Sequence, residues 1–167
     1  MTETVVLPPD SPLGGLVNRS PTLVVFLRHF GCTFCRQTMA EVGELRPRIE
    51  SSGTLIAFVH PESVDAARPW FERFGLSDVL QVSDPSLKHY VAFGLGNMRM
   101  SALLSPSVWA RGASAAASYG FGYQPPGLLR QLGGAFVVRG DRILGSFRHH
   151  SSADRPDYLD LVSSSLR

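Results

Sequence analysis

The stretch that decides the fold is TLVVFLRHFGCTFCRQ, residues 22–37. It opens with an apolar, β-branched run that has no polar alternation, TLVVFLR at 22–28. Such a run predicts a strand that is buried on both faces, as the strands of parallel sheets are. Cys32 and Cys35 follow it at once, and the chain has no other cysteine. The cysteine pair therefore stands where a buried strand passes into the next element.

That next element is predicted to be a helix that begins at about Thr33. Five apolar residues recur after it at spacings of four, three, three and four, which places them on one helical face: Cys35, Met39, Val42, Leu45 and Ile49. Polar residues, including Arg36 and Arg48, are assigned to the opposite face. Pro47 is expected to kink or end the helix, because it has no N–H to donate.

Outward from this unit the pattern repeats. We predict a buried strand at 54–60 and a short third strand at 79–84. Helices are predicted at 61–75 and, shorter, at 85–94, with a closing helix at 153–166 that has Asp154 as its N-cap. Residues 134–150 predict two strands joined by a tight turn at Gly140-Asp141. Alternation of strand and helix indicates a parallel sheet, to which the hairpin adds antiparallel strands. The predicted class is α/β, with a central mixed sheet flanked by helices.

We find no internal repeat and no domain boundary, so residues 1–167 are predicted to form a single domain. Residues 1–21 are expected to be an irregular N-terminal arm, and residues 95–127 an insertion before the C-terminal hairpin. Within that insertion SALLSPSVWA (101–110) can be helical, whereas the Gly-rich RGASAAASYGFGYQPPG (111–127) is expected to be a loop. The element order, with a cysteine pair after the first buried strand, resembles the thioredoxin fold.

Composition argues against several classes of partner. The net charge is only +2 over 167 residues and the charges are dispersed, which favours neither nucleic acid nor an anionic membrane surface. The first residues lack the basic start and apolar core of a signal peptide, and no apolar run approaches the ~18 residues of a transmembrane helix. We therefore expect a cytoplasmic protein without membrane contact. A stable structural disulfide is unusual there, so the close cysteines indicate chemistry.

The two sulfurs are predicted to be unequal. Cys32 falls at the helix start, where free N–H groups and the helix dipole favour an anion and lower a thiol pKa. Cys35 lies one turn later, within reach for a disulfide and on the core face. We expect Cys32 to be exposed and reactive and Cys35 to be sheltered and resolving. Arg28 or His29, at the end of the strand, can share charge with the thiolate.

Two other uses of a cysteine pair stay open at this point. Tetrahedral zinc needs four ligands, and His29, His149 and His150 are available, but their spacing does not require a metal and none is predicted. His149 and His150, which end the last strand, are expected in an exposed loop. An inert buried pair is the other alternative.

Four segments carry a resemblance to a known family. They are VVFLRHFGCTFCRQ (24–37), DPSLKHYVAFGL (84–95), QLGGAFVV (131–138) and GDRILGSFRH (140–149). Together they resemble the peroxiredoxin-like proteins of the AhpC/TSA type, in the branch called peroxiredoxin-like 2, from about residue 22 to the end. The resemblance implies a thioredoxin-like fold and reduction of peroxides or related substrates, including lipid endoperoxides, with electrons from thioredoxin or a low-molecular-weight thiol such as glutathione. It implies no cofactor, and a homodimer is one assembly that it allows.

The resemblance leaves open which cysteine attacks. Ordinary peroxiredoxins place the reactive cysteine three residues after a threonine, which would make Cys32 the threonine position and Cys35 the attacking thiol. The thioredoxin analogy makes Cys32 the attacker, and the helix-start argument agrees with it. Peroxiredoxins also hold the peroxide with an arginine from a later strand, for which Arg99, Arg111 and Arg130 are candidates by position only.

Two departures from thioredoxins concern the surroundings of the sulfurs. The strand before Cys32 carries no buried acid, so a base for the second thiol must come from elsewhere or be water. Gly133-Gly134 replaces the cis-proline that faces the cysteines. A cis bond is cheap only before proline, so we expect glycine's freedom in φ to make this turn. Loss of the proline ring is expected to open space beside the sulfurs for a bulky substrate or a metal, with Gly133 and Gly134 as substrate-binding residues.

The insertion at 95–127 is rich in methionine and aromatic residues among small ones, Trp109 included. One interpretation is an aromatic-lined cover that shapes an apolar pocket over the cysteines; the other is a segment packed on the sheet edge. We predict a thiol-dependent oxidoreductase that reduces a peroxide or related electrophile through a Cys32/Cys35 dithiol–disulfide cycle. The alternatives are a biosynthetic enzyme that uses this site on one metabolite, and a non-catalytic thiol sensor or metal or iron–sulfur carrier.

Overall fold

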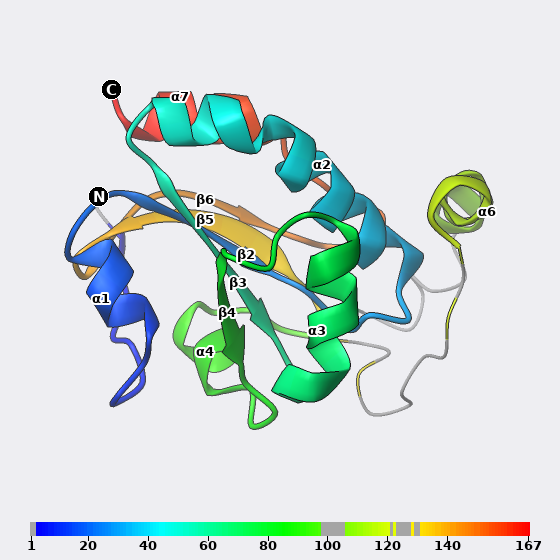
Figure 1. Ribbon diagram of the computed structural model, residues 1–167, viewed down its shortest axis with the longest axis horizontal. Coiled ribbons are helices and arrows are strands. Elements are labelled where there is room, and N and C mark those ends of the chain that lie inside the picture. The colour runs from blue at the N-terminus through cyan, green and yellow to red at the C-terminus, as the bar shows by residue number, and fades with distance from the viewer. Residues whose placement is uncertain (1–2, 98–105, 121, 123–127, 129–130) are drawn as a thin grey trace.

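Strand β2 (Thr22–Phe26), the buried run before the cysteines, lies inside a six-stranded mixed sheet (Figure 1). The computed structural model describes the chain except residues 1–2, 98–105, 121, 123–127 and 129–130. The strand order is β1-β6-β5-β2-β3-β4. The other strands are β1 (Glu3–Thr4), β3 (Leu55–His60), β4 (Leu80–Ser83), β5 (Gly134–Arg139) and β6 (Arg142–Arg148). Strands β2, β3 and β4 run parallel, and β5, β6 and β1 add antiparallel pairs.

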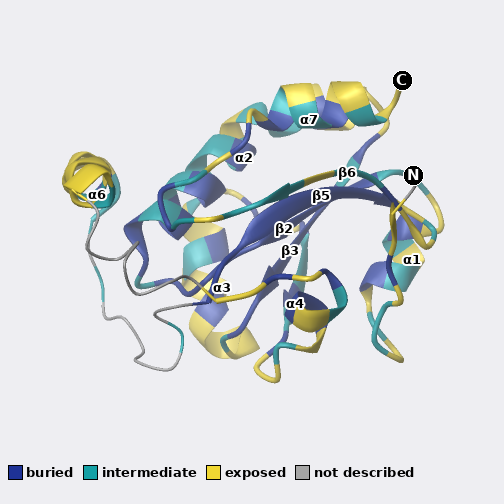
Figure 2. Cartoon of the chain, turned by 180° about the vertical axis from the view of Figure 1, so that it is seen from behind, coloured by how far each residue is buried: buried dark blue, intermediate teal, exposed yellow. Residues whose placement is uncertain are grey.

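Both faces of the sheet are covered by helices, which explains why β2 has no polar alternation. Leu23 and Val25 face a core cluster shared with α2 (Thr33–Ser51), α3 (Val64–Arg73) and α7 (Tyr158–Ser165). Val24 and Phe26 face a second cluster shared with α1 (Leu13–Val17) and α4 (Lys88–Ala92). Figure 2 shows β2 buried along its whole length and β5 buried up to its last residue, Arg139, which is exposed. The predicted α/β class and mixed sheet are confirmed.

Most predicted elements lie where the sequence places them. Helix α2 begins at Thr33, α3 is capped by Ser63 and followed by Gly75 at φ +68°, and the hairpin turns at Gly140 at φ +61°. Helix α2 does not end at Pro47 but continues to Ser51. The fully buried side chain of Ile49 holds that last turn against the core.

Two further predictions are corrected at the ends of the chain. The arm at 1–21 is not irregular: β1 pairs with β6, and Leu13 and Val17 of α1 are buried under the sheet. The cap of α7 is Asp157, whose carboxylate accepts from the N–H of Asp160 at 3.0 Å, and not Asp154. Pro156 explains the shift, because the residue before a proline is held out of the helical region.

The insertion holds helix α6 (Pro106–Tyr119), so residues 111–119 are helical and not a loop. Pro106 suits the first helical position, and alanines favour the helix enough to offset Gly112. Helix α6 stands off the sheet beside the N-terminal end of α2, with much of its surface exposed (Figures 1 and 2). Among the described residues, no helix combines the length and the apolar character needed to cross a membrane.

Candidate functional site

Both cysteines lie at the carboxyl end of β2, at the start of α2. Cys32 is the N-cap of α2, with φ −77° and ψ 119°, and Cys35 lies in its first turn. Both are free thiols. The expectation that Cys32 is exposed is wrong: Cys32 is 3% and Cys35 5% exposed. Cys32 is covered because α6 lies across the start of α2, so burial does not separate the two sulfurs.

Arg28 contacts both sulfurs, through different groups. Its guanidinium Nη1 donates to Cys32 Sγ at 3.3 Å, while its backbone N–H donates to Cys35 Sγ at 3.2 Å. The guanidinium is held in place by Nε, which donates to the carbonyl of Gln131 at 2.7 Å. The guanidinium therefore donates to Cys32, whereas the hydrogen bond from Arg28 to Cys35 comes from its neutral backbone amide.

This arrangement separates the pKa values of the two thiols. The hydrogen bond from the Cys35 thiol lowers the pKa of Cys32 to about 6 against the opposing effect of burial, with the Arg28 charge adding to the lowering. Burial raises the pKa of Cys35 well above its usual value, and its hydrogen bond to Cys32 raises it further. At neutral pH the site therefore favours a thiolate at Cys32 and a thiol at Cys35.

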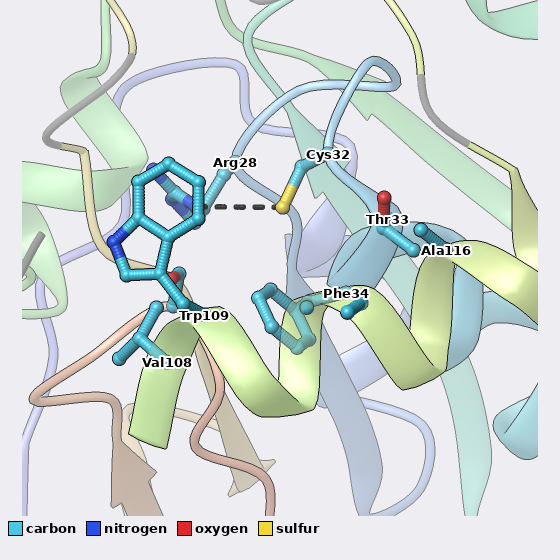
Figure 3. Close-up of a pocket in the computed structure, with 10 residues that line it drawn as sticks. Arg28, Cys32, Thr33, Phe34, Val108, Trp109 and Ala116 are labelled. Atoms are coloured by element: carbon cyan, nitrogen blue, oxygen red, sulfur yellow. Dashed lines mark hydrogen bonds between the residues drawn. The ribbon is translucent and has the colours of Figure 1, made fainter. Parts of the chain in front are cut away.

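Cys32 opens into a cavity of about 360 Å³ that Cys35 does not line. In Figure 3 the Cys32 sulfur points toward the Arg28 guanidinium, and Val108 and Trp109 of α6 lie across the space from it. The remaining lining is mostly apolar or small: Thr33, Phe34, Gly112, Ala113, Ala116 and Ser152. Trp109 lines the cavity although 69% of its surface is exposed. Three sequence-predicted site residues, Arg28, Cys32 and Trp109, thus line one cavity, and Cys35 lies next to Arg28 and Cys32 outside it.

The C-terminal end of α6 is hydrogen-bonded to the first turn of α2, next to the cysteines. Thr33 Oγ1 donates to the carbonyl of Gly120 at 2.9 Å, and Arg36 Nη1 donates to that of Tyr119 at 3.2 Å. Arg36 also donates through Nε to the carbonyl of Phe30 at 2.9 Å and lies over the Trp70 ring at 4.2 Å. The prediction that Arg36 lies on the face of α2 opposite the core is corrected: Arg36 is buried, because these carbonyls and the ring satisfy its guanidinium.

Gly133 and Gly134 do not open space beside the sulfurs. A Cβ on Gly133 would lie 2.3 Å from the carbonyl oxygen of Phe26, and one on Gly134 would lie 2.8 Å from that of Phe147. Neither glycine has a positive φ, so their role is to allow close approach of backbones where β5 begins beside β2. They line none of the cavities around the cysteines, and no cis peptide bond occurs in the described residues.

The histidines differ from expectation. His29 is fully buried, and burial together with the Arg28 and Arg36 charges lowers its pKa to about 4. It lines neither cavity beside the cysteines, so the structure does not bring it to a substrate. His149 is not in an exposed loop: its ring nitrogens are enclosed beside Phe147, whereas His150 is exposed.

Other residues of the site carry no sequence signal of their own. Gln131 orients Arg28 only because β5 returns beside β2, and Ser152 reaches the cavity from the loop after β6. Of the peroxide-holding candidates, Arg99 and Arg130 lie outside the described residues, and Arg111 is an exposed residue of α6 that does not line the Cys32 cavity. In the described part of the chain, no three His, Cys, Asp or Glu side chains are grouped as metal ligands would be.

Three solved structures with the same architecture are peroxiredoxins. Reduced Prx3 from Vibrio vulnificus covers 100% of both chains with a TM-score of 0.69 and 13% identity. A peroxiredoxin Q variant from Xanthomonas campestris covers 99% of this chain and 89% of its own, with a TM-score of 0.60 and 15% identity. AhpC from Enterococcus faecalis covers 90% and 75%, with a TM-score of 0.59 and 12% identity. The thioredoxin-like fold of peroxiredoxins is thereby confirmed.

Two of the curated proteins that align in sequence cover different shares of this chain. The "Prostamide/prostaglandin F synthase" of Danio rerio is 27% identical over 160 residues, which is 91% of this chain and 77% of that protein. The "Thioredoxin-like protein AAED1, chloroplastic" of Arabidopsis thaliana is 32% identical over 64 residues. That second match spans 38% of this chain and only 26% of the plant protein.

The family model described as AhpC/TSA antioxidant enzyme matches residues 43–151. The matched region begins after both cysteines and runs from the middle of α2 to the loop that follows β6. It includes the hairpin whose backbone closes on β2, and the segment that supplies Gln131 to Arg28. With well over half of its length matched, the chain belongs to the AhpC/TSA antioxidant enzyme family.

Proposed function

We propose that this protein reduces a peroxide or a related electrophile through a Cys32/Cys35 dithiol–disulfide cycle, with Cys32 as the attacking thiol. The observation that carries the proposal is the placement of the Arg28 guanidinium. It donates to Cys32 at 3.3 Å, on the wall of the cavity where a substrate has room. A cation in that position stabilises the thiolate and can also attract the oxygen on which negative charge develops.

The cycle has three steps. The Cys32 thiolate attacks one oxygen of the peroxide, the O–O bond breaks, and the alkoxide leaves as an alcohol after taking a proton. Cys32 is then a sulfenic acid. Cys35 loses its proton and attacks Cys32 Sγ, a disulfide forms, and the sulfenic oxygen leaves as water. A dithiol protein of the thioredoxin type, or two molecules of a low-molecular-weight thiol, returns both cysteines to thiols and becomes the disulfide.

Mass spectrometry of the reduced protein after one equivalent of hydroperoxide tests this cycle. The expected product has lost two hydrogens, with the bond mapped to Cys32 and Cys35. A Cys35→Ser variant should stop at a sulfenic acid on Cys32, while a Cys32→Ser variant should not react at the first step. Reaction of Cys32→Ser at the wild-type rate would assign the attack to Cys35, as the peroxiredoxin alignment suggests. Absence of any oxidation would reject the peroxide function.

A dedicated biosynthetic reaction on one apolar metabolite is the second candidate. The cavity beside Cys32 is about 360 Å³ and its walls are largely apolar, which suits a substrate larger than hydrogen peroxide. The Danio rerio relative is named as a synthase of prostamide and prostaglandin F, which supports a lipid endoperoxide as the substrate class. A kcat/KM for a lipid endoperoxide that exceeds those for hydrogen peroxide and small alkyl hydroperoxides would favour this candidate; equal values would favour a general peroxidase.

A further inference from the structure

We propose that His149 is the base for Cys35, and that it accepts the Cys35 proton when the disulfide closes. The inference rests on the proposed cycle. It assigns a base for the Cys35 thiol, which the strand before Cys32 does not provide because it carries no buried acid. His149 comes from the end of β6, far from the cysteines in sequence. We infer its role from a second, smaller cavity, which Cys35 lines and Cys32 does not.

Cys35 and His149 line the same cavity, which has a volume of about 10 Å³. Arg28, Thr38, Ser152 and Asp154 also line it, and Cys32 does not. This volume is close to the space that one water molecule needs, and the lining groups supply the polar partners that an internal water requires. A single water can therefore connect the Cys35 thiol to the imidazole.

The imidazole is free to accept a proton. Neither ring nitrogen of His149 has a hydrogen-bond partner among the described residues, although both are enclosed. Burial lowers its pKa to about 4, so the ring is neutral at physiological pH. The charged and titratable groups that act on it are Asp154, which raises the pKa, and Arg28 and His150, which lower it. The Cys35 thiol also lines the cavity that His149 lines, and it is the group that gives up the proton.

Asp154 fits the role of a stabilising charge better than that of the base. Its carboxylate accepts from the backbone N–H groups of His150 and Ser151 at 2.7 and 2.8 Å, and from the Ser151 hydroxyl at 2.8 Å. Although burial opposes the charge, these hydrogen bonds hold the pKa of Asp154 below its usual value. Three donors already occupy this carboxylate, so it serves better to stabilise a positive charge that forms at His149 than to take the proton itself.

Two other buried histidines whose pKa is lowered by burial are excluded by position. His29 and His60 also have ring nitrogens without a described partner, and burial lowers the pKa of each to about 4. Neither lines the cavity beside Cys35. His60 packs instead against the rings of Phe30 and Phe71, at 5.3 and 5.8 Å between centroids.

The proton is conserved in the closing step. His149 takes the proton of the Cys35 thiol through the cavity water, and the thiolate attacks Cys32 Sγ. The sulfur–oxygen bond of the sulfenic acid breaks as the disulfide forms, and the departing hydroxide accepts the proton from the imidazolium. One water is released, and His149 returns to its neutral form.

Rapid-quench mass spectrometry of a His149→Gln variant tests the assignment by separating the two oxidation steps. Formation of sulfenic acid at Cys32 should keep its wild-type rate, because His149 does not line that cavity. Disulfide closure should slow by about a hundredfold, the usual contribution of a positioned base. The closure rate of the variant should rise about tenfold per pH unit across the neutral range, since hydroxide replaces the lost base, while the wild-type rate stays nearly flat.

Two variants control for the substitution itself. His150→Gln makes the same change at the exposed neighbour, and His60→Gln makes it at a buried histidine away from the cysteines. Both should close the disulfide at the wild-type rate. Closure of His149→Gln with the wild-type rate and pH profile would overturn the proposal.

The same assignment can be tested without a peroxide. An aromatic disulfide reagent that releases a coloured thiolate reacts first with Cys32, and release of a second thiolate reports the attack by Cys35. If wild-type protein shows both releases but no reaction with peroxide, the peroxide function fails while the base remains testable. A second release in His149→Gln as fast and as pH-independent as in wild type would then reject the base.

Discussion

At the scale of single residues, the Arg28 guanidinium adds to the hydrogen bond from Cys35 in lowering the pKa of Cys32. Its side chain donates to Cys32 and its backbone N–H to Cys35, so a side-chain substitution removes the first hydrogen bond and leaves the second. Arg28→Met keeps the backbone N–H to Cys35 and removes the charge from Cys32. A hydrogen bond to a charged group is worth about 1.5–3 kcal/mol, so we expect the pKa of Cys32 to rise by about one to two units.

The measurement is the pH dependence of alkylation of Cys32 in a Cys35→Ser background, with and without Arg28→Met. The matched control is Arg111→Met, which removes an exposed arginine of α6 that does not line the Cys32 cavity. An unchanged titration curve in Arg28→Met would show that the guanidinium does not hold the thiolate.

The pH profile of the first oxidation step follows from the same residues. The attacking form is the anion, and the pKa of Cys32 is lowered to about 6. The second-order rate constant with hydroperoxide should therefore rise about tenfold per pH unit below pH 6 and become flat above it. Because the hydrogen bond from Cys35 is the largest cause of the lowering, Cys35→Ser should move the curve to higher pH. A midpoint near the ordinary cysteine value of about 8.5 in wild type would contradict the assignment.

The cysteine motif could be predicted at this scale, but its environment could not. The strand–cysteine–helix junction follows from local periodicity, and Cys32 is the N-cap as expected. The burial of Cys32 depends on α6 and the link from Arg28 to Gln131 depends on strand pairing, both at long range in the sequence. His149 was misplaced for the same reason: only the closing of β6 on β5 brings it beside Cys35.

At the scale of elements, α6 converts an open helix start into an enclosed site. It contributes Val108 and Trp109 to the wall opposite Cys32, and its C-terminal end is held by Thr33 and Arg36. The sequence did not predict the full length of α6, because its alanine, serine and glycine residues are also typical of a loop. Alanine nevertheless has the highest helix propensity. No apolar stripe marked the helix, because only Ala115 is buried among its residues.

Trp109→Ala tests whether α6 selects the substrate. We expect kcat/KM for a bulky aromatic hydroperoxide to fall about tenfold, since roughly 55 Å² of lost apolar contact corresponds to ~1.4 kcal/mol. The value for hydrogen peroxide should change little, because it is too small to reach across the cavity. Val91→Ala, which removes an exposed apolar residue of α4, is the control. An equal loss for both substrates would show a structural effect rather than selection.

At the scale of the whole molecule, the N-terminal arm completes the fold that positions the site. Strand β1 pairs with β6, and α1 covers Val24 and Phe26 on the face of β2 opposite α2. The sequence did not predict the helix and strand of this arm because both are short, with five residues in α1 and two in β1. Elements of that length are fixed by tertiary packing rather than by local propensity.

Leu13→Ala tests whether residues 1–21 unfold together with the part of the chain that carries the cysteines, as the prediction of a single domain requires. Leu13 is fully buried, so its truncation should lower the free energy of unfolding by about 2–4 kcal/mol. Val6→Ala is the control, because Val6 is 88% exposed and should change stability by less than about 0.5 kcal/mol. Tryptophan fluorescence reports on Trp70 and Trp109, which lie on the side of the sheet away from α1, and circular dichroism reports on all helices. Coincident denaturation curves that shift together would show one cooperative unit; a shift in circular dichroism alone would show that the arm is a separate unit.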